Sequence, residues 1–380
     1  MLEQEATIRK VLLHYDLDGT LCELTQLVNG HINDTFQVCL DDNGDRRQYI
    51  LQRINDYVFK NPALVMDNIL AISQYLESRL SCDDCSIITF LNNRDGRNHT
   101  VCDSGTWRLC PYIDNSVAYE QVENSQVLVS AGYAFGRFQA LLAEMPIDRL
   151  AETIPGFHHT PGRLQQLFDV ARRDPMGRAS AVARELDFFR SNSELAGRLS
   201  VLQQQGVLPL RVTHNDTKYN NILMDRNSGK PLCVIDLDTV MPGLSMHDFG
   251  DAIRFAANDA VEDETDLDKV RLNMDHYEAF TRGFMGAAGS FLTPNEVDHM
   301  ALGAIVITIE LASRFLADHI DGDRYFRIHR PGHNLDRARS QIRLAEDMLA
   351  HLDEMNAIVK QPVKSFLTTY LVEKEQYSNG

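Results

Sequence analysis

Apolar positions change their spacing along this chain, and the change predicts two structural regions. Short apolar or alternating runs predict strands within the first 110 residues, at 24–28, 35–40, 49–54, 86–91 and 106–110. Between the third and fourth runs, residues 61–80 carry apolar side chains at helical spacing. The sequence therefore predicts a small sheet with one helix inserted into it.

From residue 126 onward, apolar side chains recur mainly at helical spacing. The expected helices cover residues 126–142, 179–190, 270–285, 295–319 and 336–360. The longest apolar stretch, residues 301–309, is shorter than the roughly 20 residues of a membrane span and predicts a buried helix. We expect an α+β protein with a β-rich lobe over residues 1–110 and a larger, mostly helical lobe over residues 111–380.

One stretch of the helical region, residues 208–238, has three strand-like runs around two polar segments. If residues 222–225 pair with residues 232–235 in a hairpin, Asn221 faces Asp236 at its open end. Opposed residues of an antiparallel ladder lie about 4.5–5.5 Å apart, so their side-chain oxygens converge. Mg2+ binds one or two such protein oxygens together with phosphates and waters. The sequence therefore predicts a magnesium site at this pair.

Asp216 lies five residues before Asn221, so its carboxylate is expected to be close to that metal. It can accept the proton of a hydroxyl nucleophile, or orient the hydroxyl in line with the γ-phosphate of ATP. Phosphoryl transfer depends mainly on such positioning and on charge neutralisation. This arrangement of Asp216 beside a metal site supplies both. Asp248, Asp251 and Arg254 are expected to form a buried polar link under its loop.

The net charge of −17 restricts the choice of partners. Such a chain repels phosphodiester backbones and anionic lipid headgroups, so neither nucleic acid nor a membrane is an expected partner. The same charge makes a metal important for binding ATP phosphates. The seven Cys are an odd number, and the N-terminal MLEQEATIRK has no apolar core of a signal peptide. Reduced thiols and a cytoplasmic location are therefore expected.

The pattern His-x-Asp-x-x-x-x-Asn at residues 214–221, followed by Ile-Asp at residues 235–236, resembles the catalytic and metal-binding motifs of the aminoglycoside phosphotransferase and choline kinase superfamily. Three segments resemble N-acetylhexosamine 1-kinases: THNDTKYNNILMD, IDLDTVMPG and HDFGDAIRFAA. The likeness extends through NGHINDTF, YILQRIN, FGRFQALL, RFLADHIDGDRYF and HNLDRARSQI. It implies a two-lobed, protein-kinase-like fold and transfer of the ATP γ-phosphate to the anomeric hydroxyl of GlcNAc or GalNAc, which gives the α-1-phosphate.

The same resemblance assigns roles in the helical lobe. It implies that Asp216 is the catalytic aspartate and that Asn221 and Asp236 hold Mg2+. Lys218 occupies the place where many protein kinases keep a lysine that contacts the transferred phosphate. Two roles stay open for Asp238, which either helps to bind a second ion or only hydrogen-bonds the loop.

Residues 29–36 lie between two strand-like runs, and the resemblance makes them the nucleotide loop. Glycine permits close approach of the backbone to a phosphate, although one glycine in a hairpin is by itself typical of a turn. The expected nucleotide contacts are Gly30, His31, Asn33, Thr35 and Gln52.

Gln52 marks a departure from the superfamily, whose members usually place a phosphate-contacting Lys on the third strand. Arg53 points to the other face of an alternating strand. The ATP phosphates would then meet Mg2+, Lys218 and backbone N–H groups instead.

For the acceptor sugar, the resemblance implies contacts from Asp216, from Arg314 and Tyr325 in the C-terminal helices, and from His31 and Phe255 near the pocket mouth. Arg and Tyr suit a neutral, hydroxyl-rich ligand, because they offer directed donors and a flat apolar face. Structural alternatives stay open: Arg314 could pair with Asp318 one turn later, and Phe255 could belong to the core.

Other functions fit parts of the sequence. A sibling kinase could phosphorylate another alcohol, such as an aminoglycoside, choline or homoserine, and a pseudokinase would bind ligands without turnover. VLLHYDLDGTL at residues 11–21 matches the haloacid-dehalogenase signature, with Asp16 as nucleophile and Asp18 as acid/base, but the later acidic pair of that fold is missing. The sequence leaves open the preference between GlcNAc and GalNAc, the number of Mg2+ ions and the oligomeric state.

Overall fold

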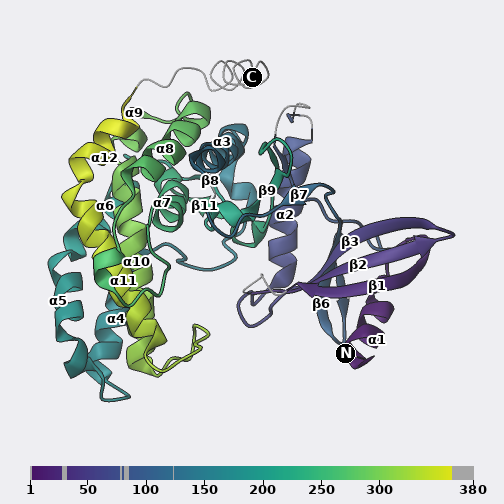
Figure 1. Ribbon diagram of the computed structural model, residues 1–380, viewed down its shortest axis with the longest axis horizontal. Coiled ribbons are helices and arrows are strands. Elements are labelled where there is room, and N and C mark those ends of the chain that lie inside the picture. Colours follow the sequence, from purple (N-terminus) through teal and green to yellow (C-terminus); the bar gives the residue numbers. More distant parts are fainter. Residues whose placement is uncertain (1, 28–31, 78, 81–84, 123, 362–380) are drawn as a thin grey trace.

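The computed structural model describes residues 2–27, 32–77, 79–80, 85–122 and 124–361. It is a mixed α+β structure, in which a twisted sheet lies at one end and most of the helices lie at the other (Figure 1). Helices α2 (Pro62–Leu76) and α3 (Ser125–Leu142) lie between these two ends, beside a second, smaller sheet (Figure 1).

The N-terminal sheet has five antiparallel strands in the order β1-β2-β3-β6-β5. They are β1 (Thr20–Leu27), β2 (Asp34–Asp42), β3 (Asp45–Arg53), β5 (Thr100–Cys102) and β6 (Gly105–Pro111). Helix α1 (Leu2–Leu12) packs against this sheet, and its Ile8 joins Phe36 and Trp107 in a small core. The proposed division of the chain near residue 110 stays a prediction; β6 ends at Pro111.

The predicted strand at residues 86–91 belongs to a different sheet from the one expected. Only β4 (Ser86–Ile87) is regular, and it pairs in parallel with β10 (Pro231–Val234). The other strands of this sheet are β9 (Ile222–Asp225) and β7 (Ser116–Val117), in the order β4-β10-β9-β7. The sequence analysis missed β5, the short outer strand of the N-terminal sheet. The second sheet therefore ties the N-terminal region to the hairpin of the predicted magnesium site.

The register of that hairpin differs by one residue from the prediction. Ile222 pairs with Val234 instead of residue 235, and the ladder shifts again between residues 231 and 233. The cause is an early turn: the Asp225 carboxylate accepts hydrogen bonds from the backbone of Asn227 (3.1 Å) and Ser228 (2.7 Å), and Asp225 N bonds Lys230 O at 2.8 Å. Asn221 therefore lies across from residue 235, and Asp236 follows one position later.

Helices build most of the C-terminal region. Beyond α3 they are α4 (Thr160–Arg173), α5 (Ala183–Ser191), α6 (Ser193–Gln204), α7 (Ser245–Ala256), α8 (Met274–Ala288), α9 (Pro294–Asp298), α10 (Met300–Asp321), α11 (His333–Ala350) and α12 (Leu352–Val359). The sequence analysis missed α4, α6 and α7. Two long predicted helices are each divided, at His299 and at His351, where the backbone leaves helical geometry.

Helix α10 forms the centre of the helical region, and the expected buried helix is confirmed. By length and composition it is the one described helix that could cross a membrane, but 83% of its apolar window is buried inside the protein. Gly250 of α7 and Gly303 of α10 bring these two helices together. A Cβ atom at Gly250 would lie 2.4 Å from Gly303 O, and one at Gly303 would lie 2.3 Å from Met246 O. This close contact fixes α7, which supports the candidate active site, against α10.

Candidate active site

The loop of residues 214–221 follows β8 (Arg211–Thr213), which pairs with β11 (Met241–Gly243). The His214 ring is buried against Phe135 and Phe138, with ring centroids 5.4 and 5.9 Å apart. Asn215 has a positive φ of 65°, and its side-chain amide donates to Thr239 O at 2.9 Å. Asparagine tolerates this left-handed conformation better than most residues. Buried side chains therefore fix the shape of the loop.

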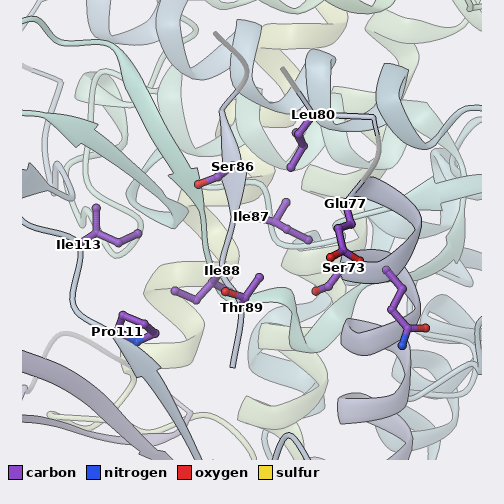
Figure 2. Close-up of a pocket in the computed structure, with 10 residues that line it drawn as sticks. Ser73, Glu77, Leu80, Ser86, Ile87, Ile88, Thr89, Pro111 and Ile113 are labelled. Atoms are coloured by element: carbon purple, nitrogen blue, oxygen red, sulfur yellow. The ribbon is translucent and has the colours of Figure 1, made fainter. Parts of the chain in front are cut away.

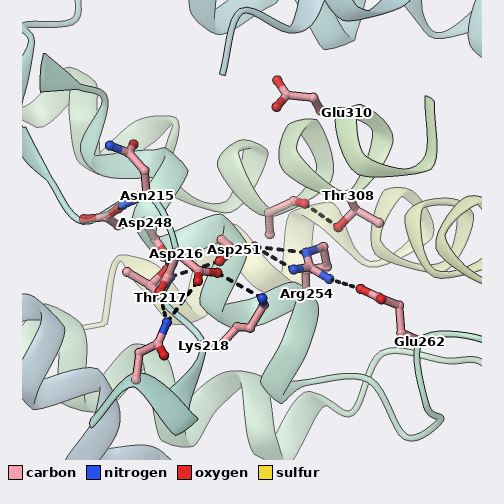
Figure 3. A network of polar contacts seen from close by, with 12 residues as sticks. Asn215, Asp216, Thr217, Lys218, Asp248, Asp251, Arg254, Glu262, Thr308 and Glu310 are labelled. Carbon is pink, nitrogen blue, oxygen red and sulfur yellow. Dashed lines mark hydrogen bonds and ion pairs between the residues drawn. The ribbon is translucent and has the colours of Figure 1, made fainter. Parts of the chain in front are cut away.

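Two carboxylates of α7 accept hydrogen bonds from the backbone of this loop. Asp248 accepts from His214 N at 2.9 Å and from Asn215 N at 2.7 Å. Asp251 accepts a hydrogen bond from Thr217 N in the same loop at 3.0 Å, and another from Arg254 Nη2 at 2.7 Å (Figure 3). The predicted buried polar link under the loop is therefore confirmed.

Asp216 is held between a cation and an amide. Lys218 Nζ lies 3.0 Å from its carboxylate (Figure 3). Asn221 Nδ2 donates to the same carboxylate at 3.1 Å. Burial alone would raise the pKa of Asp216, but Lys218, His214 and the hydrogen bonds lower it below its usual value. The same pairing raises the pKa of Lys218. At neutral pH the loop therefore presents an ionised carboxylate beside an ammonium group.

Asp236 follows the hairpin in the left-handed conformation, with φ of 58°. Burial raises its pKa to about 7, and the negative charges of Asp238 and Asp216 add to this effect. Within the described residues, no group donates a hydrogen bond to the Asp236 carboxylate or to Asn221 Oδ1. A bound divalent cation would neutralise the crowded carboxylates and use these free oxygens, so the residues fit Mg2+.

The described part of the chain contains no group of three or more His, Cys, Asp and Glu side chains that could hold a metal. A closed protein cage is therefore absent from that part. The pair Asn221 and Asp236 instead suits a cation that takes its remaining ligands from phosphates and water, as Mg2+ does in nucleotide sites.

Three of the predicted nucleotide contacts lie together at the N-terminal sheet. Asn33 Nδ2 donates to Asp238 Oδ2 at 2.7 Å, and Gln52 Nε2 donates to Thr35 Oγ1 at 3.2 Å. Arg108 connects them, because its Nε donates to Gln52 Oε1 at 2.9 Å and its Nη1 pairs with Asp238 Oδ1. The other two predicted contacts, Gly30 and His31, lie outside the described residues.

The predicted sugar-binding residues Arg314 and Tyr325 lie close to each other. The Arg314 guanidinium is 5.8 Å from the ring centroids of Tyr325 and Phe157 and 5.4 Å from that of Phe326. We call these four residues together with Arg163 the Arg314 cluster.

The alternative partner of Arg314, Asp318, has another role. Asp318 accepts hydrogen bonds from the backbone N–H groups of Arg324, Tyr325 and Phe326, at 2.8–2.9 Å. It thereby fixes the segment that carries Tyr325. No ion pair joins Arg314 to Asp318 among the described residues, so that alternative is wrong. Phe255 lies partly buried against the core, with its ring 5.0 Å from that of Tyr219 in the catalytic loop.

A buried polar contact that the sequence analysis missed connects α10 to the catalytic loop. Glu310 is 1% exposed; His158 Nδ1 lies 2.9 Å from its carboxylate, and Thr160 Oγ1 donates to it at 2.6 Å. His158 Nε2 lies 3.4 Å from Asn215 O. Burial alone would raise the pKa of Glu310, but His158, Thr160 and Arg314 lower it to about 2. The sequence signal for this contact was Glu310 itself, a single acidic residue at the end of the apolar run of α10.

His247 packs beside this contact and is expected to make stability depend on pH. Its ring lies 5.1 Å from that of His158, and burial together with His158 lowers its pKa from 6.5 to about 3. Between these values the unfolded chain binds a proton that the folded chain does not. The free energy of unfolding should therefore fall by about 1.4 kcal/mol for each pH unit below 6.5 on account of this residue.

We expect His247→Gln to reduce that slope, as measured by urea unfolding between pH 6.5 and 4.5. His14→Gln is the matched control, because the His14 side chain is exposed. An unchanged slope in His247→Gln would show that the buried His247 does not contribute to it.

Two other features share no residue with this site. The side chain of Asp16 is 99% exposed, and the apolar run before it ends a helix, α1, instead of forming a strand, which does not fit the phosphatase alternative. A pocket of about 480 Å³ lies between the end of α2, β4 and the segment after β6, where it is lined by Ser73, Glu77, Ile87 and Ile113 (Figure 2). No predicted site residue lines it.

The model of the phosphotransferase enzyme family (APH) matches residues 23–282, more than half of the chain. The chain belongs to this family. It is therefore a small-molecule kinase.

Solved structures confirm the two-lobed, kinase-like α+β fold. A microcompartment-associated aminopropanol kinase is 17% identical, with a TM-score of 0.64 over 93% of this chain and 98% of that one. Spectinomycin phosphotransferase APH(9)-Ia, in complex with ADP and spectinomycin, is 14% identical, with a TM-score of 0.56 over 92% and 98%. Choline kinase from Cryptosporidium parvum Iowa II is 13% identical, with a TM-score of 0.55 over 96% and 99%.

Proposed function

We propose that this kinase transfers the γ-phosphate of ATP to the anomeric hydroxyl of N-acetylhexosamines, GlcNAc or GalNAc, and releases ADP and the α-1-phosphate. The observation that supports the proposal is the position of the Arg314 cluster: the Arg314 charge lowers the pKa of Glu310, and His158, the partner of Glu310, contacts the backbone of Asn215 in the catalytic loop. In this proposal, an acceptor bound at this cluster extends toward the loop that carries Asp216.

The charge of the Arg314 cluster favours a neutral sugar over a cationic alcohol. Burial lowers the pKa of Arg163, and the nearby Arg314 charge adds to this effect, so two guanidinium groups act on the same region. The Nε of Arg163 is buried without a hydrogen-bond partner among the described residues. Glu310, the carboxylate closest to them in this contact chain, is already bonded to His158 and Thr160. Aminoglycosides and choline would be repelled there, whereas sugar hydroxyl and acetamido oxygens would accept hydrogen bonds.

The proposed mechanism divides the work among residues of the catalytic loop and the hairpin. The ionised Asp216 orients the anomeric hydroxyl and accepts its proton as the new bond to the γ-phosphorus forms and the bond to the ADP oxygen breaks. Lys218, 3.0 Å from Asp216, contacts the transferred phosphate. Asn221 and Asp236 would hold Mg2+, which neutralises phosphate charge when bound. Asp238 stays a candidate ligand, although both of its oxygens already have partners in Arg108 and Asn33.

The test is ADP release by the purified full chain with ATP and Mg2+, across GlcNAc, GalNAc, galactose, choline, homoserine and kanamycin. We expect turnover with the two N-acetylhexosamines and loss of the sugar's reducing end in the product. Turnover with only choline, homoserine or kanamycin would overturn the sugar assignment and favour a sibling kinase. Absence of turnover with every acceptor would favour a pseudokinase.

We also propose that residues 1–110 form a nucleotide-binding lobe and that residues 111–380 form a helical lobe. A second proposal is that the protein is cytoplasmic. Five cysteines are free thiols, which supports a reducing compartment: Cys22, Cys39, Cys102, Cys110 and Cys233.

A further inference from the structure

A buried arginine lies where the N-terminal sheet meets the candidate metal loop. Arg108 of β6 is 1% exposed, although it carries one of the largest side chains of the protein. Its guanidinium lies over the Phe90 ring at 4.6 Å and contacts Met66. Burying an arginine is costly unless its charge is paired and its N–H groups are bonded. The Arg108 guanidinium therefore needs charged and polar partners inside the protein.

Arg108 and Gln52 are direct partners in the sheet. Gln52 pairs with Arg108 in the register of β3 and β6, and the two side chains are bonded at 2.9 Å. Side chains that face each other in this way have Cβ atoms about 4.5–5.5 Å apart, so a Lys at position 52 would place two cations together in a buried site. An amide at 52 and a guanidinium at 108 are therefore complementary. The cation that β3 lacks is supplied by the next strand.

The partner of Arg108 belongs to the other lobe and to the candidate metal loop. Asp238 is 2% exposed and lies two residues after Asp236. One of its oxygens pairs with Arg108, and the other accepts from Asn33 at 2.7 Å. Asn33 Oδ1 in turn accepts from Asn55 N at 3.0 Å. Arg108 and Asn33, both from the N-terminal sheet region, thus bind the carboxylate of Asp238 in the loop that carries Asp236.

We propose that Arg108 is a positioning residue for binding of the nucleotide and its metal: through the ion pair with Asp238, it holds Asp236 in register with the N-terminal sheet. The inference rests on phosphotransferase chemistry and does not depend on which alcohol is the acceptor. Because Arg108 acts through Asp238, its loss should change the requirement for Mg2+ more than the affinity for the acceptor.

The test is the binding of a fluorescent ADP analogue to the purified full chain, titrated with Mg2+ and followed by anisotropy. We expect Arg108→Gln to raise the Mg2+ concentration for half-maximal binding by about 10- to 100-fold, the usual effect of losing a residue that orients a metal ligand. Arg108→Lys keeps the charge but not the planar fork, so it should fall between Arg108→Gln and the wild type. Arg53→Gln is the matched control, because Arg53 lies next to Gln52 but is 43% exposed.

A double variant separates positioning from general stability. Arg108→Gln/Asp238→Asn leaves no unpaired buried charge, so it should fold even if Arg108→Gln alone does not. If Arg108 and Asp238 act as a unit, the double variant should need no more Mg2+ for half-maximal binding than whichever of Arg108→Gln and Asp238→Asn needs more. At saturating Mg2+ and ATP, the KM for the acceptor should stay at the wild-type value.

Several outcomes would overturn the inference. One is a folded Arg108→Gln protein with the Mg2+ dependence of the wild type, and another is an equal rise in the Mg2+ requirement in Arg53→Gln. The others are additive effects on the Mg2+ requirement in the double variant and nucleotide binding by the wild type that does not depend on Mg2+. The binding assay needs no acceptor. Failure of the sugar assignment would therefore leave this test valid, and failure of this test would leave the sugar assignment standing.

Discussion

Asp216→Asn is expected to lower kcat for phosphorylation of the acceptor by about 10²- to 10⁴-fold, the range that a positioned general base contributes. The amide has nearly the same shape as the carboxylate and keeps an oxygen for Asn221 Nδ2, which lies 3.1 Å from the carboxylate. It cannot accept the proton of the acceptor hydroxyl. The binding of MgADP should change little, because Asp216 is not one of the two predicted metal ligands.

The measurement is steady-state ADP release with purified protein, together with equilibrium binding of MgADP. Asp187→Asn is the matched control: it removes one carboxylate that is 71% exposed and should leave kcat at the wild-type value. If Asp216→Asn keeps kcat within about threefold of the wild type, Asp216 is not the group that accepts the proton.

The sequence placed the residues of the Asp216 loop near one another because the information for this loop is local. His214, Asp216, Lys218 and Asn221 lie within eight residues, and α7 supplies its supporting carboxylates from a second short segment. Asp248 and Asp251 are three residues apart on α7, so they lie on one face of that helix, and both are buried, where a carboxylate needs hydrogen-bond donors. The identities of these residues were therefore sufficient to predict their relationship, even though α7 itself was missed.

The parts that the sequence did not predict depend on pairing between distant segments. Arg108 contacts Asp238 across 130 residues, and His158 contacts Glu310 across 152. Neither pair has a spacing that a local pattern can reveal, because tertiary packing brings the partners together: α2 packs against residues 237–239, and α4 packs against α10. The register error at Asp236 has a local cause, the turn that Asp225 closes early, but strand alternation alone does not distinguish the two turn lengths.

Asp236→Asn is expected to change function and stability in opposite directions. Removing the carboxylate removes a predicted Mg2+ ligand, so kcat/KM for MgATP should fall by about 10²-fold or more, as charge neutralisation by the metal is central to phosphoryl transfer. In metal-free protein, the same ionised carboxylate destabilises the folded state, because burial and the charges of Asp238 and Asp216 raise its pKa from 3.8 to about 7. The folded state therefore disfavours its ionised form.

The sign of the stability effect follows from that shift. Above pH 7, Asp236 is ionised in both the folded and the unfolded chain, and the full destabilisation is present; it disappears as the pH falls toward 3.8, because the folded chain binds the proton first. Asp236→Asn should thus raise the free energy of unfolding at pH 8, in EDTA and without nucleotide, by up to about 4 kcal/mol, the equivalent of about three pKa units.

The gain in Asp236→Asn should shrink steadily below pH 7, as measured by urea unfolding at several pH values. Asp225→Asn tests the alternative that any carboxylate of the hairpin gives the gain; it should destabilise instead, because Asp225 closes the turn. Addition of MgADP should stabilise the wild type but not Asp236→Asn, since a ligand stabilises only the state that binds it. Equal stabilisation of both proteins by MgADP would show that Asp236 does not hold the metal. If Asp236→Asn is less stable than the wild type at pH 8, the crowded carboxylates do not repel one another.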